Sequence, residues 1–152
     1  MFSRRQFLFS LLTLSSLRAL DFHKTNPDAW EKSTLNEAAM ALYGEKKFST
    51  IRKSTNVELI APRHIVRDQY NITIGIKSNI MAKSVAIFQD ANPKALVAVF
   101  NIHNFDPVDF EINIQMEFKG TLFAVVEGAN GVLYYTRTFI DVLCLPCVTG
   151  TE

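Results

Sequence analysis

The chain has 152 residues, and its 16 basic and 15 acidic side chains leave the net charge near zero. That balance gives no sign of the basic patch or stripe that nucleic-acid binding requires. The hydrophobic fraction of 48% is ordinary for a globular protein, and the length suits one domain with its own core. We find no internal repeat, low-complexity tract or second domain.

Residues 1–20 are predicted to be an export signal. Arg4 and Arg5 stand directly before an apolar run, 7–17, of about 11 residues, which is too short to cross the roughly 30 Å hydrocarbon core of a bilayer. The run is therefore interpreted as the apolar region of a signal peptide, with an uncleaved anchor as the alternative. The pattern Ser-Arg-Arg-Gln-Phe-Leu resembles a twin-arginine export signal. Removing it takes three of the 16 basic residues and none of the 15 acidic ones, which leaves a net charge of −2. We expect a periplasmic protein without stable membrane insertion.

The segment 27–43 is predicted to form a short N-terminal helix. It begins with an Asn-Pro-Asp cap, and Gly44 provides the stop. Apolar residues recur at helical spacing between them: Trp30, Leu35, Ala38, Ala39 and Leu42. Thr34 and Glu37 offer a capping box for a second, shorter start. We expect one amphipathic helix that covers part of a sheet.

From residue 55 the hydrophobic period changes to two, which indicates strands. Seven are predicted: 55–61, 69–77, 83–90, 94–103, 110–118, 121–127 and 132–143. The clearest apolar faces contain Tyr70, Ile72, Ile74 and Ile76 in one strand, and Phe110, Ile112, Ile114, Met116 and Phe118 in another. Asn130-Gly131 is a hairpin signal. The pattern predicts an all-β fold, an immunoglobulin-like antiparallel β-sandwich over about 55–143, with a closed barrel as the alternative.

Two cysteines, Cys144 and Cys147, stand in the last segment, 144–152, which we expect to be a flexible arm. A thioredoxin-type Cys-x-x-C motif needs a βαβ setting, and here a strand precedes the motif. A zinc site needs two more ligands, and the three histidines are scattered singly. We therefore predict no metal and no other cofactor. A disulfide between the two cysteines, and Cys144 as a resolving thiol, both stay open.

Several stretches resemble the SoxY family, the sulfur carriers of the periplasmic thiosulfate-oxidising (Sox) system. They are Lys83–Phe88, Asn92-Pro93-Lys94 leading into Val97–Phe100, Gly131–Tyr135, and a last strand that ends in cysteine. The resemblance covers about residues 28–147. It implies an immunoglobulin-like domain over 21–143, paired as a heterodimer with a second β-protein, SoxZ. It also implies a carrier cysteine on a C-terminal arm.

On this resemblance, Cys147 occupies the carrier position, to which the sulfur compound is covalently attached. Cytochrome-type enzymes would load thiosulfate there and a hydrolase would release sulfate, so the chain itself would not be an enzyme. Leu145, Pro146 and Val148 stand where the family has glycines; Pro146 fixes one φ angle where glycine leaves it free. The competing interpretation is an exported immunoglobulin-like adaptor whose terminal cysteines form a structural disulfide.

Overall fold

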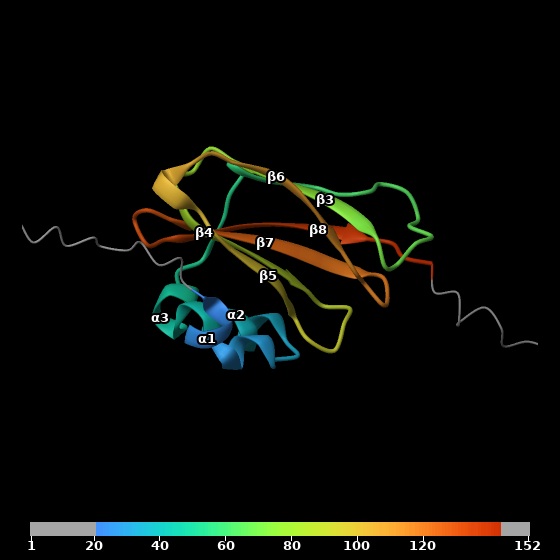
Figure 1. Ribbon diagram of the computed structural model, residues 1–152, viewed down its shortest axis with the longest axis horizontal. Helices are drawn as coiled ribbons and strands as arrows, with labels where there is room; N and C mark the ends of the chain where they lie inside the picture. Colours follow the sequence, from blue (N-terminus) through green and yellow to red (C-terminus); the bar gives the residue numbers. More distant parts are fainter. Residues whose placement is uncertain (1–20, 144–152) are drawn as a thin grey trace, which may run out of the picture.

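The computed structural model describes residues 21–143 as a β-sandwich with a layer of short helices against one of its sheets (Figure 1). Several predicted functional residues lie outside the described residues: Arg4, Arg5, Cys144, Leu145, Pro146, Cys147 and Val148. The described part therefore tests the scaffold that carries the predicted arm.

The helical segments come first in the chain. They are α1 (Phe22–Thr25), the 3₁₀ helix η1 (Pro27–Trp30), α2 (Leu35–Tyr43) and α3 (Glu45–Phe48); a 3₁₀ turn, η2 (His103–Phe105), comes later. The strands are β1 (Arg52–Lys53), β2 (Val57–Ile60), β3 (Ile72–Ser78), β4 (Ala82–Gln89), β5 (Leu96–Asn101), β6 (Val108–Ile114), β7 (Gly120–Gly128) and β8 (Leu133–Ile140).

These strands form two sheets, ordered β1-β8-β7-β4-β5 and β2-β3-β6. The chain crosses between them as in immunoglobulin-like sandwiches, which confirms the predicted fold. Every pair is antiparallel except β1 and β8, which run parallel. Strand β1 was not predicted, because Arg52 and Lys53 are both exposed and carry no alternating pattern.

The main core lies between the two sheets. In β3 the three isoleucines are buried and the intervening Thr73 is exposed, as the period-two pattern predicted. The opposing sheet supplies a matching set of buried side chains: Val85, Ile87, Leu122, Ala124, Val126 and Ile140. Burying each Val, Leu or Ile side chain contributes about 1.5–3 kcal/mol, so this interface stabilises the sandwich strongly.

A second core lies between the helices and the outer face of the five-stranded sheet. Its helical side chains are small or aliphatic, and those of the sheet are larger: Ala29, Ala38, Ala39 and Leu42 pack against Ala86, Phe88, Leu96, Val125 and Leu133. The alanines of α2 allow the helix to approach the sheet closely. The predicted role of this segment, covering part of a sheet, is confirmed.

The prediction of one helix over 27–43 is wrong in its first half. The chain leaves helical geometry after η1, and the Lys32 carbonyl accepts a 2.9 Å hydrogen bond from Ala95 N–H in the β4–β5 connection. The observed helix, α2, begins after Thr34, at the second of the two predicted starts. Thr34 Oγ1 accepts from Glu37 N–H at 3.3 Å, which caps the helix, and donates to Glu37 Oε2 at 2.8 Å. The helix ends at Gly44, whose φ of +85° suits glycine.

Five predicted strands are longer than the observed ones: 55–61, 69–77, 94–103, 110–118 and 132–143. In two of them a specific contact explains the difference. Strand 69–77 begins only at Ile72, because Asp68 forms a turn that accepts hydrogen bonds from the next backbone N–H groups, and Tyr70 is 68% exposed. Strand 110–118 ends at Ile114, since Met116 N–H turns to the Gln69 carbonyl at 3.0 Å. The predicted apolar positions Tyr70 and Phe118 therefore lie in loops and face solvent.

Candidate functional site

The described chain ends at a tightly fixed point beside the last strand. After β8, Val142 is buried and forms a parallel bridge with Val66. Val66 N–H donates to the Asp141 carbonyl at 2.8 Å, and Leu143 N–H donates to the Val66 carbonyl at 2.9 Å. We call residues 141–143 together with Val66 the root. Cys144 is the next residue, so the backbone is held up to the residue that precedes the first cysteine.

Val66 was not singled out from the sequence. It sits in the irregular stretch between β2 and β3, where no alternation marks it, and only its burial and its pairing reveal its role. In Figure 1 this stretch, the β6–β7 connection and the end of β8 meet at the same end of the sandwich, away from the helices. The root therefore lies at the end opposite the helical layer.

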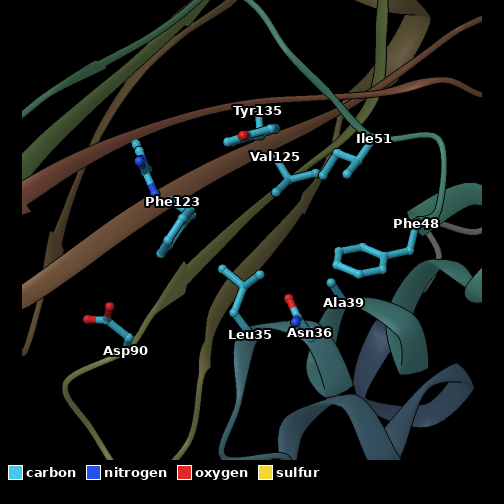
Figure 2. Close-up of a pocket in the computed structure, with 10 residues that line it drawn as sticks. Leu35, Asn36, Ala39, Phe48, Ile51, Asp90, Phe123, Val125 and Tyr135 are labelled. Carbon is cyan, nitrogen blue, oxygen red and sulfur yellow. The ribbon is translucent and has the colours of Figure 1, made fainter.

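A groove of about 340 Å³ lies between the helices and the five-stranded sheet (Figure 2). Leu35, Ala39 and Phe48 face the strand residues Phe123 and Tyr135 across it. Its lining is mostly apolar, with Asp90 and Arg137 as its charged members. The Asp90 carboxylate accepts a 2.6 Å hydrogen bond from Thr121 N–H, which gives it a structural role. Among the described residues that line the groove, the Tyr135 phenol is the one hydroxyl, and none is a thiol or an imidazole.

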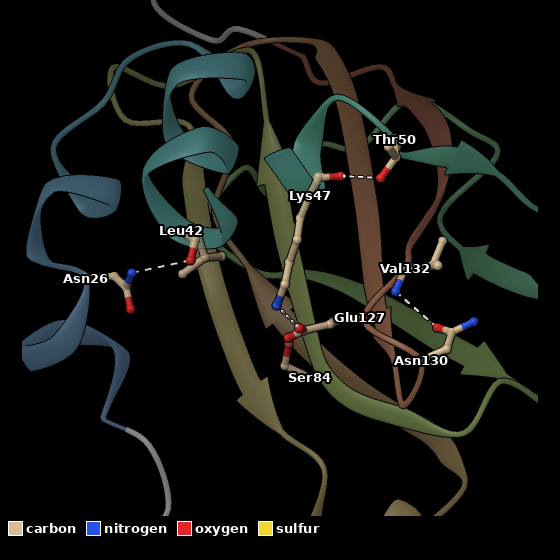
Figure 3. Close-up of polar contacts among 8 residues, drawn as sticks. All are labelled: Asn26, Leu42, Lys47, Thr50, Ser84, Glu127, Asn130 and Val132. Carbon is tan, nitrogen blue, oxygen red and sulfur yellow. Dashed lines mark hydrogen bonds and ion pairs between the residues drawn. The ribbon is translucent and has the colours of Figure 1, made fainter. Parts of the chain in front are cut away.

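A polar cluster joins α3 to the sheet (Figure 3). Lys47 Nζ forms a 2.6 Å ion pair with Glu127 Oε1, and Ser84 Oγ donates to Glu127 Oε2 at 3.2 Å. The nearby Tyr43 hydroxyl is buried and has no hydrogen-bond partner within residues 21–143. Burial raises the pKa of Tyr43 well above its usual value. The neighbouring Ser84 hydroxyl lowers this pKa, and the negative charge of Glu127 raises it further. These contacts fasten the helices to the sheet.

His23, Asp109 and Glu111 occupy structural or solvent-exposed positions. His23 stacks on Trp30, with the ring centroids 3.7 Å apart. Asp109 forms an exposed ion pair with Lys77, and Glu111 is exposed on the same strand, so both lie on a solvated face. Within residues 21–143, no three His, Cys, Asp or Glu side chains come together as a metal-binding group. In the same range no helix has the length and apolar character needed to span a membrane.

The fold and the root define an immunoglobulin-like module whose fixed last strand leads directly into a segment with two cysteines. The family model of the sulfur oxidation protein SoxY matches residues 39–147, well over half of the chain and including both cysteines. The chain therefore belongs to the SoxY family, as its sequence motifs suggested.

The structural comparison agrees. The sulfur carrier protein SoxY from Chlorobium limicola f thiosulfatophilum superposes with a TM-score of 0.64 at 25% identity, over 73% of this chain and 97% of that one. Superoxide reductase (neelaredoxin) from Ignicoccus hospitalis gives a TM-score of 0.51 at 13% identity, over 58% of this chain and 80% of that one, which shows a shared sandwich fold alone. No match is found among the curated proteins.

Proposed function

We propose that this protein is an exported sulfur carrier that holds thiosulfate-derived groups covalently on Cys147 during thiosulfate oxidation. Membership of the SoxY family and the match to a solved sulfur carrier support this role. The structural observation that carries it is the root. A fixed backbone at Leu143 followed four residues later by a thiol is what a carrier needs in order to present its cargo from a constant position.

The chemistry requires two kinds of enzyme acting on the same sulfur. In loading, the Cys147 thiol loses its proton, its sulfur bonds to the outer sulfur of thiosulfate, and two electrons pass to a cytochrome. In release, water attacks the sulfonate sulfur and the bond between the two outer sulfurs breaks. Sulfate and two protons leave, and the bonding electrons stay on Cys147 as a persulfide anion. The carrier supplies the attacking sulfur and the leaving group. The enzymes supply the electron acceptor and the activated water.

The position of the thiol suits attack by partners and gives it little help from its own chain. A free thiol has a pKa of about 8.5 and is only a few per cent ionised at neutral pH. No Lys, Arg or His neighbours Cys147 in the sequence. A partner's active site therefore supplies the positive charge or the base that forms the thiolate. This division of labour belongs to a non-catalytic carrier subunit.

The same proposal includes export and a partner subunit. Residues 1–20, with Arg4 and Arg5, act as a twin-arginine-type signal, which delivers the chain to the periplasm. There it pairs with a SoxZ-like β-protein, and the Sox cytochrome and hydrolase act on residues 144–152. Leu145, Pro146 and Val148 make this arm stiffer and bulkier than one built from glycines. Partner channels for this carrier must accommodate that bulk.

Intact-protein mass spectrometry tests the role directly. The mature protein is incubated with thiosulfate and the Sox cytochrome and then weighed before and after reduction. The carrier function predicts an added thiosulfate group that reduction removes and that Cys147→Ser abolishes. Two results together would instead identify the structural disulfide of an adaptor. The protein without substrate would be lighter by two hydrogens until it is reduced, and no adduct would form under any condition.

A further inference from the structure

Exposed apolar side chains concentrate around the root. Six large hydrophobic side chains are exposed over residues 21–143, and four of them belong to the segments at this end: Ile65, Tyr70, Phe118 and Phe139, which are 54%, 68%, 49% and 58% exposed. We call these four residues the collar. Three of the four are aromatic, the residue class that dominates the energetics of protein interfaces.

The backbone contacts hold the collar against the root. Ile65 precedes Val66, which forms the two hydrogen bonds to Asp141 and Leu143. Phe139 lies at the end of the ladder between β7 and β8, where it pairs with Thr121 and the next residue, Ile140, pairs with Gly120. The loop that contains Phe118 joins this group because Met116 N–H donates to the Gln69 carbonyl, the residue before Tyr70.

The side chain of Asn92, in the β4–β5 connection, also holds the segment before Phe118. Asn92 Nδ2 donates to the Gln115 carbonyl at 3.0 Å, and Asn92 Oδ1 accepts from Glu117 N–H at 2.7 Å. The residues before Phe118 are thus tied to two neighbouring segments. The collar therefore consists of exposed side chains on a held backbone, which lowers the entropy that docking would cost.

Charged side chains of both signs surround the collar. They are exposed and lie in the same three segments: Arg63, Arg67, Asp68, Glu117, Lys119 and Asp141. An apolar centre with a polar rim is the composition of a specific protein interface, whereas a solvated loop end would carry mainly the polar part. Three basic and three acidic residues give no net charge, so the surface does not select a strongly charged partner.

The reach of the arm dictates what must approach this surface. Cys147 is the fourth residue after Leu143, and four extended residues span at most about 13–14 Å. For Cys147 to enter an enclosed active site, the rim of that site has to come within this distance of the root. The collar is the surface that the rim then meets.

On the basis of the proposed carrier function, we propose that the collar is the docking surface for the active-site entrance of the enzymes that act on Cys147. Each entrance presents a small apolar rim with mixed charges outside it. The contact is transient, below about 1,200 Å² in total, so that one carrier can visit several enzymes in turn. The collar sets the encounter affinity, and the thiol sets the chemistry.

The test compares collar variants with a matched control at the other end of the sandwich. Tyr70→Ser and Phe139→Ser remove collar side chains. Met81→Ser removes an equally exposed one (60%) beside the β7–β8 hairpin, where Ala129 N–H donates to the Met81 carbonyl at 2.7 Å. Loading of the heterodimer by thiosulfate and the Sox cytochrome is followed by intact mass as a function of carrier concentration. We expect each collar variant to lower kcat/KM for loading by about 10-fold, mainly through KM, and Met81→Ser to leave it unchanged.

Two further readouts separate the possible failures. Alkylation of Cys147 by iodoacetamide needs no docking, so its rate should be equal in all variants. Dissociation of the SoxZ-like subunit from the collar variants would assign the collar to the subunit interface and overturn the docking role. Unchanged enzymatic loading of the collar variants would overturn the docking role too. If Cys147→Ser is not loaded in the same assay, the carrier function still stands in that case. If Cys147→Ser were loaded normally, the carrier function itself would be wrong.

Discussion

The outer face of the five-stranded sheet has two regions that treat the same kind of side chain in opposite ways. On the β4–β5 side, Phe88 is fully buried beneath the helical layer. Near the end of β8, Phe139 on the same sheet is 58% exposed beside the root. The helices would cover more apolar surface if they extended to that end. This uncovered end is the surface that we propose as the docking site for partner enzymes.

The largest effect should come from exchanging the two phenylalanines for alanine. Phe88→Ala opens a cavity in the helix–sheet core and should reduce the free energy of unfolding by about 3–5 kcal/mol. Phe139→Ala removes an exposed side chain and should change it by less than about 0.5 kcal/mol. Denaturant unfolding of residues 21–143 measures both. Equal losses would mean that the two regions are packed alike.

Close packing at the root end is tested with two glycines. A methyl group on buried Gly120 would lie 2.5 Å from Asp90 Oδ1 and 2.8 Å from Ala91 Cβ, so Gly120→Ala should destabilise the fold by about 1–3 kcal/mol. A methyl on Gly75 would meet Ile60 Cβ at an ordinary 3.4 Å. Gly75→Ala should therefore be neutral or slightly stabilising, since it also restricts the unfolded chain. If Gly120→Ala is tolerated as well as Gly75→Ala, the root end is loosely packed, which would contradict the close packing described here.

The helical layer is tested at its cap. Thr34→Ala removes the acceptor for Glu37 N–H and should cost about 1 kcal/mol in thermal or denaturant unfolding. Thr34→Ser keeps the hydroxyl and serves as the control. If both variants have the stability of the parent, the Thr34 cap does not stabilise the start of α2.

The smallest effect concerns pH. The pKa of Tyr43 is raised in the folded protein, so above its usual value of 10.0 the unfolded chain loses this proton while the folded chain keeps it. Stability should therefore fall as pH rises above about 10. Tyr43→Phe removes this contribution and should reduce that fall, whereas the exposed Tyr70→Phe should not. Below pH 10, Tyr43→Phe should be neutral or slightly stabilising, because the lost hydroxyl has no partner within residues 21–143. Parallel pH curves for the parent and Tyr43→Phe would contradict the burial effect.

Sequence patterns predicted the fold well where a residue's burial follows from its own strand. The isoleucines of β3 and the Asn130-Gly131 turn, in which Asn130 Oδ1 accepts from Val132 N–H at 3.0 Å (Figure 3), are examples. Predictions failed where distant segments decide. The Lys32 carbonyl leaves the helix to pair with Ala95, and Met116 leaves its strand to pair with Gln69.

The candidate site divides in the same way. Cys147 is a prediction from the sequence that rests on its residue type and its position in the family resemblance, and it lies outside the described residues. The root and the collar could not be predicted, because a parallel bridge between Val66 and Val142 and the exposure of Tyr70 and Phe118 depend on contacts between separate loops. An Asp that turns the chain at position 68 was the one local signal that Tyr70 leaves the strand.

The most direct measurement is thiosulfate-dependent reduction of the Sox cytochrome in the presence of the carrier heterodimer. Replacing Cys147 by serine should abolish electron transfer, while replacing Cys144 by serine should leave at least the first loading turnover intact. Sustained cytochrome reduction with a carrier that has serine at position 147 would show that the sulfur is held elsewhere, and would contradict the account.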